Sequence, residues 1–281
     1  MSKSALLVSN HMSGSYDDCN VEEIARALSA SGYELAKELD CASGEVPDAA
    51  ALDDGAYDLL VVLGGDGTLQ SVLSKAAGWG GIALALPGGT QNLLCKSLYG
   101  DRDVGQVLEL LEGGHLSPRR RNCINWSGGC ALIEILAGPG ARWSEVRESM
   151  RDGGIAETVG TTMDVAEDTL GGSWVRLAES GKGDENGYPG IRLVAENGGM
   201  VVEGYTAHDI GEIAAQGAAL LGRNFRDGPH DELGTLDQVT LESVDGAVMA
   251  LMCDGERVET GAREGFSLAP FDLDLLGLAD G

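Results

Sequence analysis

A single aspartate lies inside a glycine-rich segment of the sequence, GGDGT at residues 64–68. The preceding residues 58–63 form a nearly continuous apolar run, and apolar residues at helical spacing follow from Leu69 onward. Glycines allow a sharp turn and a close approach to a ligand, while the N–H groups at a helix start attract phosphate. Asp66 would repel a bare phosphate, so its presence indicates Mg²⁺ shared with nucleotide oxygens. Thr68 can cap the helix and donate its hydroxyl to a phosphate. On its own, the motif is also compatible with an ordinary strand-to-helix turn.

A second glycine-rich segment, PGGTQN at residues 87–92, follows the next apolar run at residues 82–86. Near the start of the chain, the apolar run at residues 5–8 ends in a polar segment that contains Asn10 and Ser13. In a parallel sheet, the loops after neighbouring strands emerge at the same carboxyl edge, where ligands of open α/β sheets bind. Three such loops favour one ligand crevice over three unrelated turns. The chain has neither the GxxxxGK[ST] segment nor the GxGxxG segment of other nucleotide sites.

Alternating strands and helices are needed to position these loops. Residues 1–118 show that alternation, with apolar runs typical of strands buried on both faces of a parallel sheet. Beyond residue 118 the apolar runs become shorter and lie among frequent glycines, which is typical of antiparallel strands. We therefore predict an N-terminal α/β domain with a parallel sheet at residues 1–118 and a β-rich antiparallel domain at residues 119–281.

The chain of 281 residues carries 45 acidic and 19 basic residues, a formal net charge of −26. The field of such a chain opposes binding to nucleic acid, which we exclude as a primary function. No stretch approaches the roughly 18 consecutive apolar residues of a membrane span. The six cysteines form no CxxC pair. We expect a soluble cytoplasmic protein with reduced thiols that is at most peripheral to a membrane.

Together, these motifs resemble a known family. GGDGT and PGGTQN, preceded by Asn10 and Ser13 and followed by DGE at residues 254–256, resemble the diacylglycerol kinase catalytic-domain family, which includes bacterial lipid kinases and the sphingosine and ceramide kinases. The resemblance covers essentially the whole chain, with its specific motifs in residues 58–100 and 248–275. It implies a two-domain enzyme that uses ATP and Mg²⁺. The γ-phosphoryl group would pass to a lipid hydroxyl in a cleft between an α/β nucleotide domain and a β-rich lipid-binding domain.

The resemblance also implies roles for individual residues. Asp66 would hold Mg²⁺–ATP, and Glu256 would be the general base that takes the proton of the lipid hydroxyl, with Asp254 supporting the turn. Such a division suits phosphoryl transfer, which depends on positioning and on charge neutralisation. By itself, the DGE segment is typical of a hairpin turn between two apolar runs. The nucleotide-binding residues implied are Asn10, Ser13, Gly64, Gly65, Gly67, Thr68, Gly88, Gly89, Thr90 and Asn92.

Two alternative functions stay open. Family members often place an aspartate shortly after the last helix of the first domain, where this chain reads RRRN at residues 119–122. A non-catalytic nucleotide- or lipid-binding protein on the same scaffold would fit that difference. NAD kinases also carry GGDGT, although PGGTQN and DGE resemble the lipid-kinase pattern.

The sequence also suggests a membrane surface and a second copy of the chain as partners. The arginine triplet at residues 119–121 can attract an anionic lipid surface or can be a solvated interdomain segment. We expect the lipid substrate to be met at a membrane surface, and the sequence does not choose the acceptor lipid. An exposed edge strand in the β-rich domain would allow a homodimer.

Overall fold

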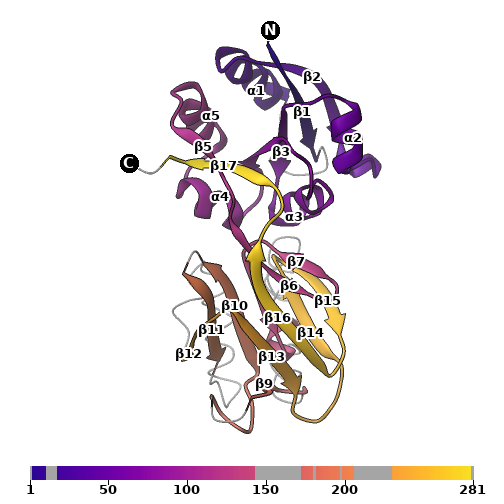
Figure 1. Cartoon of the computed structure of the whole chain (residues 1–281), viewed down its shortest axis with the longest axis vertical. Helices are drawn as coiled ribbons and strands as arrows, with labels where there is room; N and C mark the ends of the chain where they lie inside the picture. The colour runs from indigo at the N-terminus through magenta and orange to yellow at the C-terminus, as the bar shows by residue number, and fades with distance from the viewer. Residues whose placement is uncertain are drawn as a thin grey trace, which may run out of the picture. The chain divides into compact units, whose positions relative to one another are not determined.

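A computed structural model describes residues 2–10, 18–142, 172–179, 182–196, 198–205 and 230–279 of the chain. The chain divides into two compact units, which are described separately. The first comprises Met1–Arg121 and Pro270–Gly281, and the second comprises Asn122–Ala269. Figure 1 labels helices and strands together in the first unit, whereas the labelled elements of the second unit are all strands.

The first unit is built on a six-stranded sheet with the order β2-β1-β3-β4-β17-β5. All neighbouring strands in this sheet run parallel except β5, which is antiparallel to β17. Every residue of β3 is buried, and β1 and β4 are buried over most of their length, as expected of strands covered on both faces. The strands are β1 (Lys3–Ser9), β2 (Tyr33–Asp40), β3 (Leu59–Gly64), β4 (Ile82–Pro87), β5 (Leu116–Arg119) and β17 (Asp274–Leu278).

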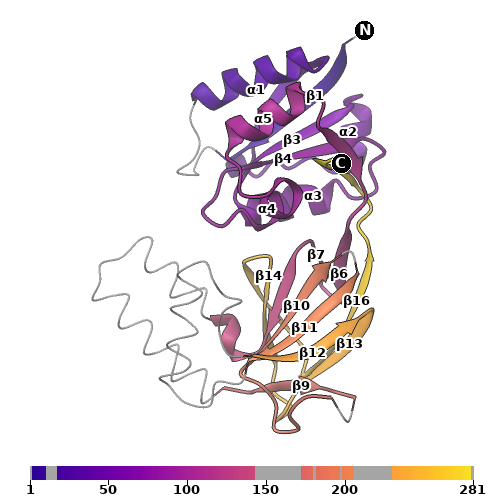
Figure 2. The same cartoon turned by 90° about the vertical axis from the view of Figure 1, so that its left-hand side faces the viewer.

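Helices cover both faces of this sheet. α1 and α5 lie on one side of it, and α3 and α4 lie on the other (Figure 2). α3 buries Leu69, Val72 and Leu73, a spacing that places one apolar face against the strands. α5 begins with a capping box, in which Asp103 and Gln106 each bind the other's backbone N–H. The helices are α1 (Asp18–Ala30), η1 (Cys41–Ser43), α2 (Ala49–Asp54), α3 (Asp66–Lys75), α4 (Leu93–Tyr99) and α5 (Val104–Glu112).

The second unit contains two antiparallel sheets, with the orders β12-β11-β10-β8-β14-β15 and β7-β6-β16-β13-β9. The structure thus confirms the predicted fold class, an α/β domain with a largely parallel sheet followed by a β-rich antiparallel domain. The elements are β6 (Asn122–Trp126), β7 (Gly129–Ala131), β8 (Glu134–Ala137), η2 (Pro139–Arg142), β9 (Val175–Leu177), β10 (Gly190–Glu196), β11 (Gly199–Tyr205), β12 (His230–Leu236), β13 (Gln238–Ser243), β14 (Met249–Cys253), β15 (Glu256–Thr260) and β16 (Arg263–Pro270).

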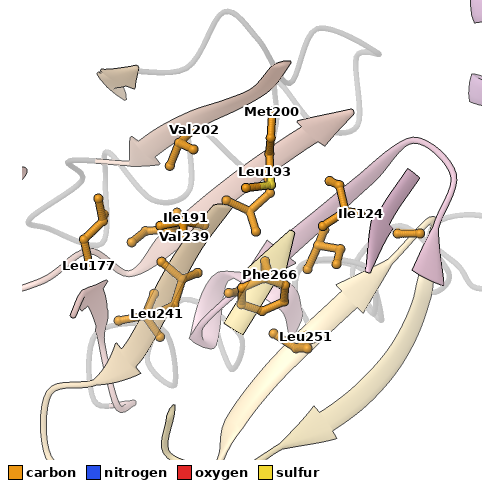
Figure 3. Packing of buried hydrophobic residues seen from close by; sticks show 14 of the residues in the cluster. Ile124, Leu177, Ile191, Leu193, Met200, Val202, Val239, Leu241, Leu251 and Phe266 are labelled. Carbon is orange, nitrogen blue, oxygen red and sulfur yellow. The ribbon is translucent and has the colours of Figure 1, made fainter. Parts of the chain in front are cut away.

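Buried apolar side chains from both sheets form the core of the second unit. Figure 3 shows these side chains pointing toward one another, with Phe266 among Ile124, Leu193 and Leu251. Successive residues of a strand point to opposite faces of its sheet. On β10, Leu193 therefore faces the core and Arg192 lies on the opposite face.

The C-terminal strand marks a difference from the predicted domain bounds. The sequence predicted that residues 119–281 form the second domain, whereas the chain returns to the first unit at Pro270, and β17 lies between β4 and β5. Phe271, Leu273 and Leu275 of the returning segment are buried. Local patterns cannot reveal such a return, because the pairing joins strands that are far apart in the sequence.

Arg120 ties the end of β5 to the returning segment. Its Nε donates to Asp274 Oδ1 and its Nη1 donates to Asp272 Oδ1, both at 2.6 Å. Arg121 Nη1 donates to Ser97 Oγ at 2.7 Å. Two arginines of the triplet therefore bind partners within the first unit.

Arg120→Ala should lower the free energy of unfolding by at most about 1 kcal/mol at low ionic strength, because both ion pairs are partly exposed to solvent. The loss should shrink in about 1 M salt, where charges are screened over about 3 Å. Urea denaturation at two salt concentrations measures both effects. Arg26→Ala, which removes an exposed pair with Glu23 on α1, is the control. Equal losses for the two variants, or a loss that salt does not change, would contradict a stabilising role for Arg120.

Candidate active site

Two glycine-rich loops contact each other backbone to backbone at the carboxyl ends of β3 and β4. The Gly88 N–H donates to the Gly64 carbonyl oxygen at 2.8 Å. A Cβ atom added to Gly88 would lie 2.8 Å from Gly64 Cα, and one added to Gly89 would lie 2.6 Å from Gly65 Cα. Real Cβ atoms essentially never come this close to another heavy atom. The contact between the loops therefore requires glycine at these positions, whatever ligand the loops also bind.

Asn92 shapes the second loop. Its Oδ1 accepts the Gly89 N–H at 2.7 Å, and its Nδ2 donates to the Gly89 carbonyl oxygen at 2.8 Å. Asn92 is the N-cap of α4 and has a φ of 51°, a left-handed conformation that asparagine adopts more readily than most residues. Thr90 lies between these two residues in the loop. Asn92 thus orders the loop, and its contact with a nucleotide stays a prediction.

Asp66 is the first residue of α3 and links the two loops. Its Oδ1 accepts the Leu94 N–H from the first turn of α4 at 3.3 Å. Its side chain is half-buried. Burial, and then the negative charge of Asp66, raise the pKa of the Cys95 thiol, which is therefore protonated at neutral pH. The site thus holds a partly shielded carboxylate that is oriented by a backbone N–H of the first turn of α4.

Thr68 and Asn10 bring the segment after β1 to the same edge of the sheet. Asn10 Nδ2 donates to Thr68 Oγ1 at 3.4 Å. The Thr68 side chain lies against Gly64, where an added Cβ would come within 2.6 Å of Thr68 Cβ. The prediction that Thr68 caps α3 is wrong, because the N-cap is Gly65 and Thr68 lies inside the first helical turn. Gly67 is the second residue of the same helix.

The three loops that were predicted to share one ligand crevice are thus joined by hydrogen bonds. Asn10, after β1, donates to Thr68, which follows β3. Gly88, after β4, donates to Gly64, and Asp66 accepts the N–H of Leu94 at the start of α4. Ser13, which was assigned to the same edge, lies outside the residues that the structure describes.

In the second unit, Asp254 and Gly255 form the two-residue turn between β14 and β15. Cys253 and Glu256 are paired across this turn, and Asp254 and Gly255 have φ values of 49° and 94°. Two positive φ values in succession characterise the tight hairpin turn that favours Asp-Gly. The DGE segment therefore forms a hairpin, and Glu256 is the exposed first residue of β15.

Asp254 is buried although it lies in a hairpin turn, and its side chain accepts three backbone hydrogen bonds. Its Oδ2 accepts the Leu132 N–H at 2.5 Å, and its Oδ1 accepts the N–H groups of Ile133 and Glu134, both at 2.9 Å. Burial raises the pKa of Asp254 to about 6, against the lowering effect of the three donors. The segment that supplies these donors, residues 132–134, carries no motif of its own, so no sequence pattern signals this contact.

Comparison with known proteins relates the first unit to a known family. Residues 4–120 match the sequence profile of the family described as "Diacylglycerol kinase catalytic domain". The matched residues include both glycine-rich loops and Asp66. Residues 4–120 are therefore similar to a diacylglycerol kinase catalytic domain. This match indicates a protein of the lipid-kinase type. A search of curated proteins finds no match to the chain.

Solved structures share the fold over nearly the whole chain. A crystal structure of a diacylglycerol kinase from Bacillus anthracis strain Sterne has a TM-score of 0.65 at 14% identity and covers 98% of this chain and 97% of its own. A second structure from the same strain, described provisionally as a diacylglycerol kinase, has a TM-score of 0.65 at 16% identity and covers 98% and 95%. This likeness in fold extends beyond the diacylglycerol kinase catalytic domain matched by sequence and includes the second unit.

Gly88→Ala should destabilise the diacylglycerol kinase catalytic domain by about 1–3 kcal/mol, the usual effect of inserting a methyl group into a closely packed site. Its Cβ would meet backbone atoms of Gly64, which cannot rotate away. Urea denaturation measures the change. Gly80→Ala is the matched control, because no atom lies within 4 Å of its added Cβ. If the two alanine variants prove equally stable, the close contact between the loops is not present in solution.

Asp254→Asn should remove a pH dependence of stability between about pH 4 and about pH 6. The pKa of Asp254 rises from 3.8 to about 6 on folding. Within this window the folded state keeps a proton that the unfolded state has released, so the free energy of unfolding falls as the pH rises. A shift of about two units corresponds to about 3 kcal/mol. Urea denaturation across this range should show the wild type losing stability relative to the variant. A difference that stays constant with pH would contradict the raised pKa.

Proposed function

We propose that this protein is an ATP-dependent lipid kinase that transfers the γ-phosphoryl group of ATP to a lipid hydroxyl. The observation that carries the proposal is the junction of two glycine-rich loops with Asp66 in a diacylglycerol kinase catalytic domain. The family match supports the assignment of the protein as a kinase. Its use of ATP, Mg²⁺ and a lipid acceptor is what we propose. It assigns the nucleotide to the first unit and the general base to Glu256 of the second.

Mg²⁺ suits the donor set around Asp66. In the described part of the chain, no group of three or more histidine, cysteine, aspartate or glutamate residues is placed to hold a metal ion. Mg²⁺ commonly binds through only one or two carboxylates and completes its coordination with phosphate oxygens and water. One carboxylate beside a phosphate loop therefore matches a cation that arrives with its nucleotide. When bound, the cation neutralises charge on the phosphate oxygens.

The nucleotide phosphates would be held mainly by backbone N–H groups. Residues 64–68 and 87–92 contain no lysine or arginine. The first turn of α3 offers N–H groups and the positive end of the helix dipole. We assign Gly64, Gly65, Gly67 and Thr68 to this cradle. From the neighbouring loops, we assign Asn10, Gly88, Gly89, Thr90 and Asn92 as supporting residues.

Glu256 would activate the acceptor. It is an exposed carboxylate at the start of β15. We propose that it takes the proton of the lipid hydroxyl as that oxygen attacks the γ-phosphorus. The bond from the γ-phosphorus to the β–γ bridging oxygen then breaks, and ADP leaves with the electron pair.

The lipid would be met at a membrane surface. Among the described helices, none is long and apolar enough to cross a bilayer. We therefore propose that the protein binds the surface of the membrane that holds its acceptor.

The test is a phosphorylation screen with labelled ATP and Mg²⁺. The acceptors are diacylglycerol, monoacylglycerol, a sphingoid base and ceramide in mixed micelles, with NAD included. Label in one or more lipids supports the proposal and names the acceptor. Label in NAD alone overturns it in favour of an NAD kinase. ATP binding without label in any acceptor overturns it in favour of a non-catalytic binding protein.

Glu256→Gln should lower kcat for the labelled lipid by about 10²–10⁴-fold, the usual contribution of a general base. The KM for ATP should change little, because the nucleotide is assigned to the other unit. Steady-state kinetics at saturating lipid measure both constants. Glu259→Gln, the same change at another exposed position of β15, is the matched control and should retain wild-type turnover. A Glu256→Gln enzyme with wild-type kcat would show that the base lies elsewhere.

A further inference from the structure

An ion triad centred on the buried Arg192 lies on the side of β10 that faces away from the core of the second unit. Arg192 is only 5% exposed. Its Nε and Nη2 donate to Glu134 Oε2 at 2.8 and 2.5 Å, and its Nη1 donates to Glu203 Oε2 at 3.0 Å. The three residues come from the neighbouring strands β8, β10 and β11. The triad therefore clamps the three strands together through their side chains.

Packing alone does not require charges at this place. Leu136 lies directly opposite Arg192 on β8, and Val194 and Val201 form an apolar pair one step along the same face. Replacing a buried ion triad by apolar residues of similar volume is often neutral or stabilising, because burying charges removes them from water. The triad therefore needs an explanation other than stability.

Glu134 connects the triad to the turn that precedes Glu256. Its carboxylate binds Arg192, its N–H donates to Asp254 Oδ1 at 2.9 Å, and its carbonyl oxygen accepts the Asp254 N–H at 3.0 Å. Asp254 also binds the N–H groups of the two residues before Glu134. One continuous set of contacts thus runs from Arg192 to the Asp254-Gly255 turn.

Glu256 depends on this turn for its position. Among the described strands, β15 lies at the edge of its sheet and pairs with β14, and Glu256 is its first residue. A general base must be held within about 0.5 Å of its productive position. An exposed side chain gains little positional support from packing, so its position depends on the backbone that carries it.

We propose that Asp254 and the Arg192–Glu134–Glu203 triad form one positioning network that holds the turn carrying Glu256. The proposal rests on the proposed function of Glu256 as the general base. None of the four residues is assigned a contact with substrate. They act through the backbone of residues 132–134 and 254–256.

The first test compares Asp254→Asn with Asp245→Asn. Asparagine presents one oxygen where aspartate presents two, so its NH₂ group would face one of the three N–H donors. Asp245 is the matched control, because it also precedes a glycine with positive φ and accepts a backbone N–H, but lies at the other end of β14. Asp254→Asn should lower kcat at least tenfold and leave the KM for ATP within twofold. Asp245→Asn should leave both constants within twofold of the wild type.

The second test replaces the triad by apolar residues, with Arg192→Met, Glu134→Leu and Glu203→Leu combined. This variant leaves no buried charge unpaired within the triad, so the fold should be retained, and kcat should again fall at least tenfold with an unchanged KM for ATP. If Asp254→Asn does not fold, this variant decides alone. Hydrogen exchange by mass spectrometry provides a readout that does not need activity. Peptides covering residues 131–136 and 253–259 should exchange at least tenfold faster in both variants.

The outcomes separate the two proposals. Wild-type kcat and wild-type exchange at residues 253–259 in either variant overturn the network, and so does an equal loss of kcat in Asp245→Asn. If the wild type labels no acceptor, the proposed function fails, and the exchange rates at residues 253–259 alone decide whether the network holds the turn.

Discussion

The candidate site of the first unit depends on one constraint, the contact between the backbones of two loops. Gly64 and Pro87 end β3 and β4 as register partners, so the loops after these strands start side by side. They can stay side by side only where no Cβ intervenes. Asn92 then turns the second loop into α4, and the N-terminal end of that helix meets Asp66. The position of the carboxylate is therefore a consequence of the close approach of the glycines.

In the second unit, the Asp254-Gly255 turn is held by buried hydrogen bonds and not by a close contact between glycines. A two-residue Asp-Gly turn normally lies in solvent and needs only its own backbone preference. Here the aspartate is buried, and its three N–H donors do not offset the loss of water, because its pKa stays raised. The ionised carboxylate of Asp254 therefore lowers the stability of the folded state. Strongly shifted pKa values are more common at functional sites than in ordinary turns, which agrees with the proposal that this turn carries the general base.

Local patterns predicted the features that depend on neighbours in the sequence. The apolar runs before GGDGT and PGGTQN predicted buried strands followed by helices, and the DGE segment predicted a hairpin. The features that were missed depend on residues far apart in the sequence. The return of β17 to the first sheet, the contacts of Asp254 with residues 132–134, and the Arg192–Glu134 pair all join segments separated by more than fifty residues or by a whole unit. The role of Thr68 was also missed, although it depends on neighbours in the sequence. The helix begins at Asp66, so Gly65 is the N-cap, and sequence patterns do not locate a helix start to a single residue.

The charge of the chain explains why the phosphate site would rely on backbone groups. A net charge of −26 opposes the approach of any polyanion, and the two loops carry no lysine or arginine to reverse it locally. Backbone N–H groups attract phosphate without adding a charged side chain that would need burial or a counter-ion. They leave the charge of the phosphates largely in place, however, so a divalent cation is the natural complement, and Asp66 is the residue at the junction of the loops that can hold one. Under the proposed function, a single carboxylate beside the bound phosphates would therefore follow from the lack of lysine and arginine in the two loops.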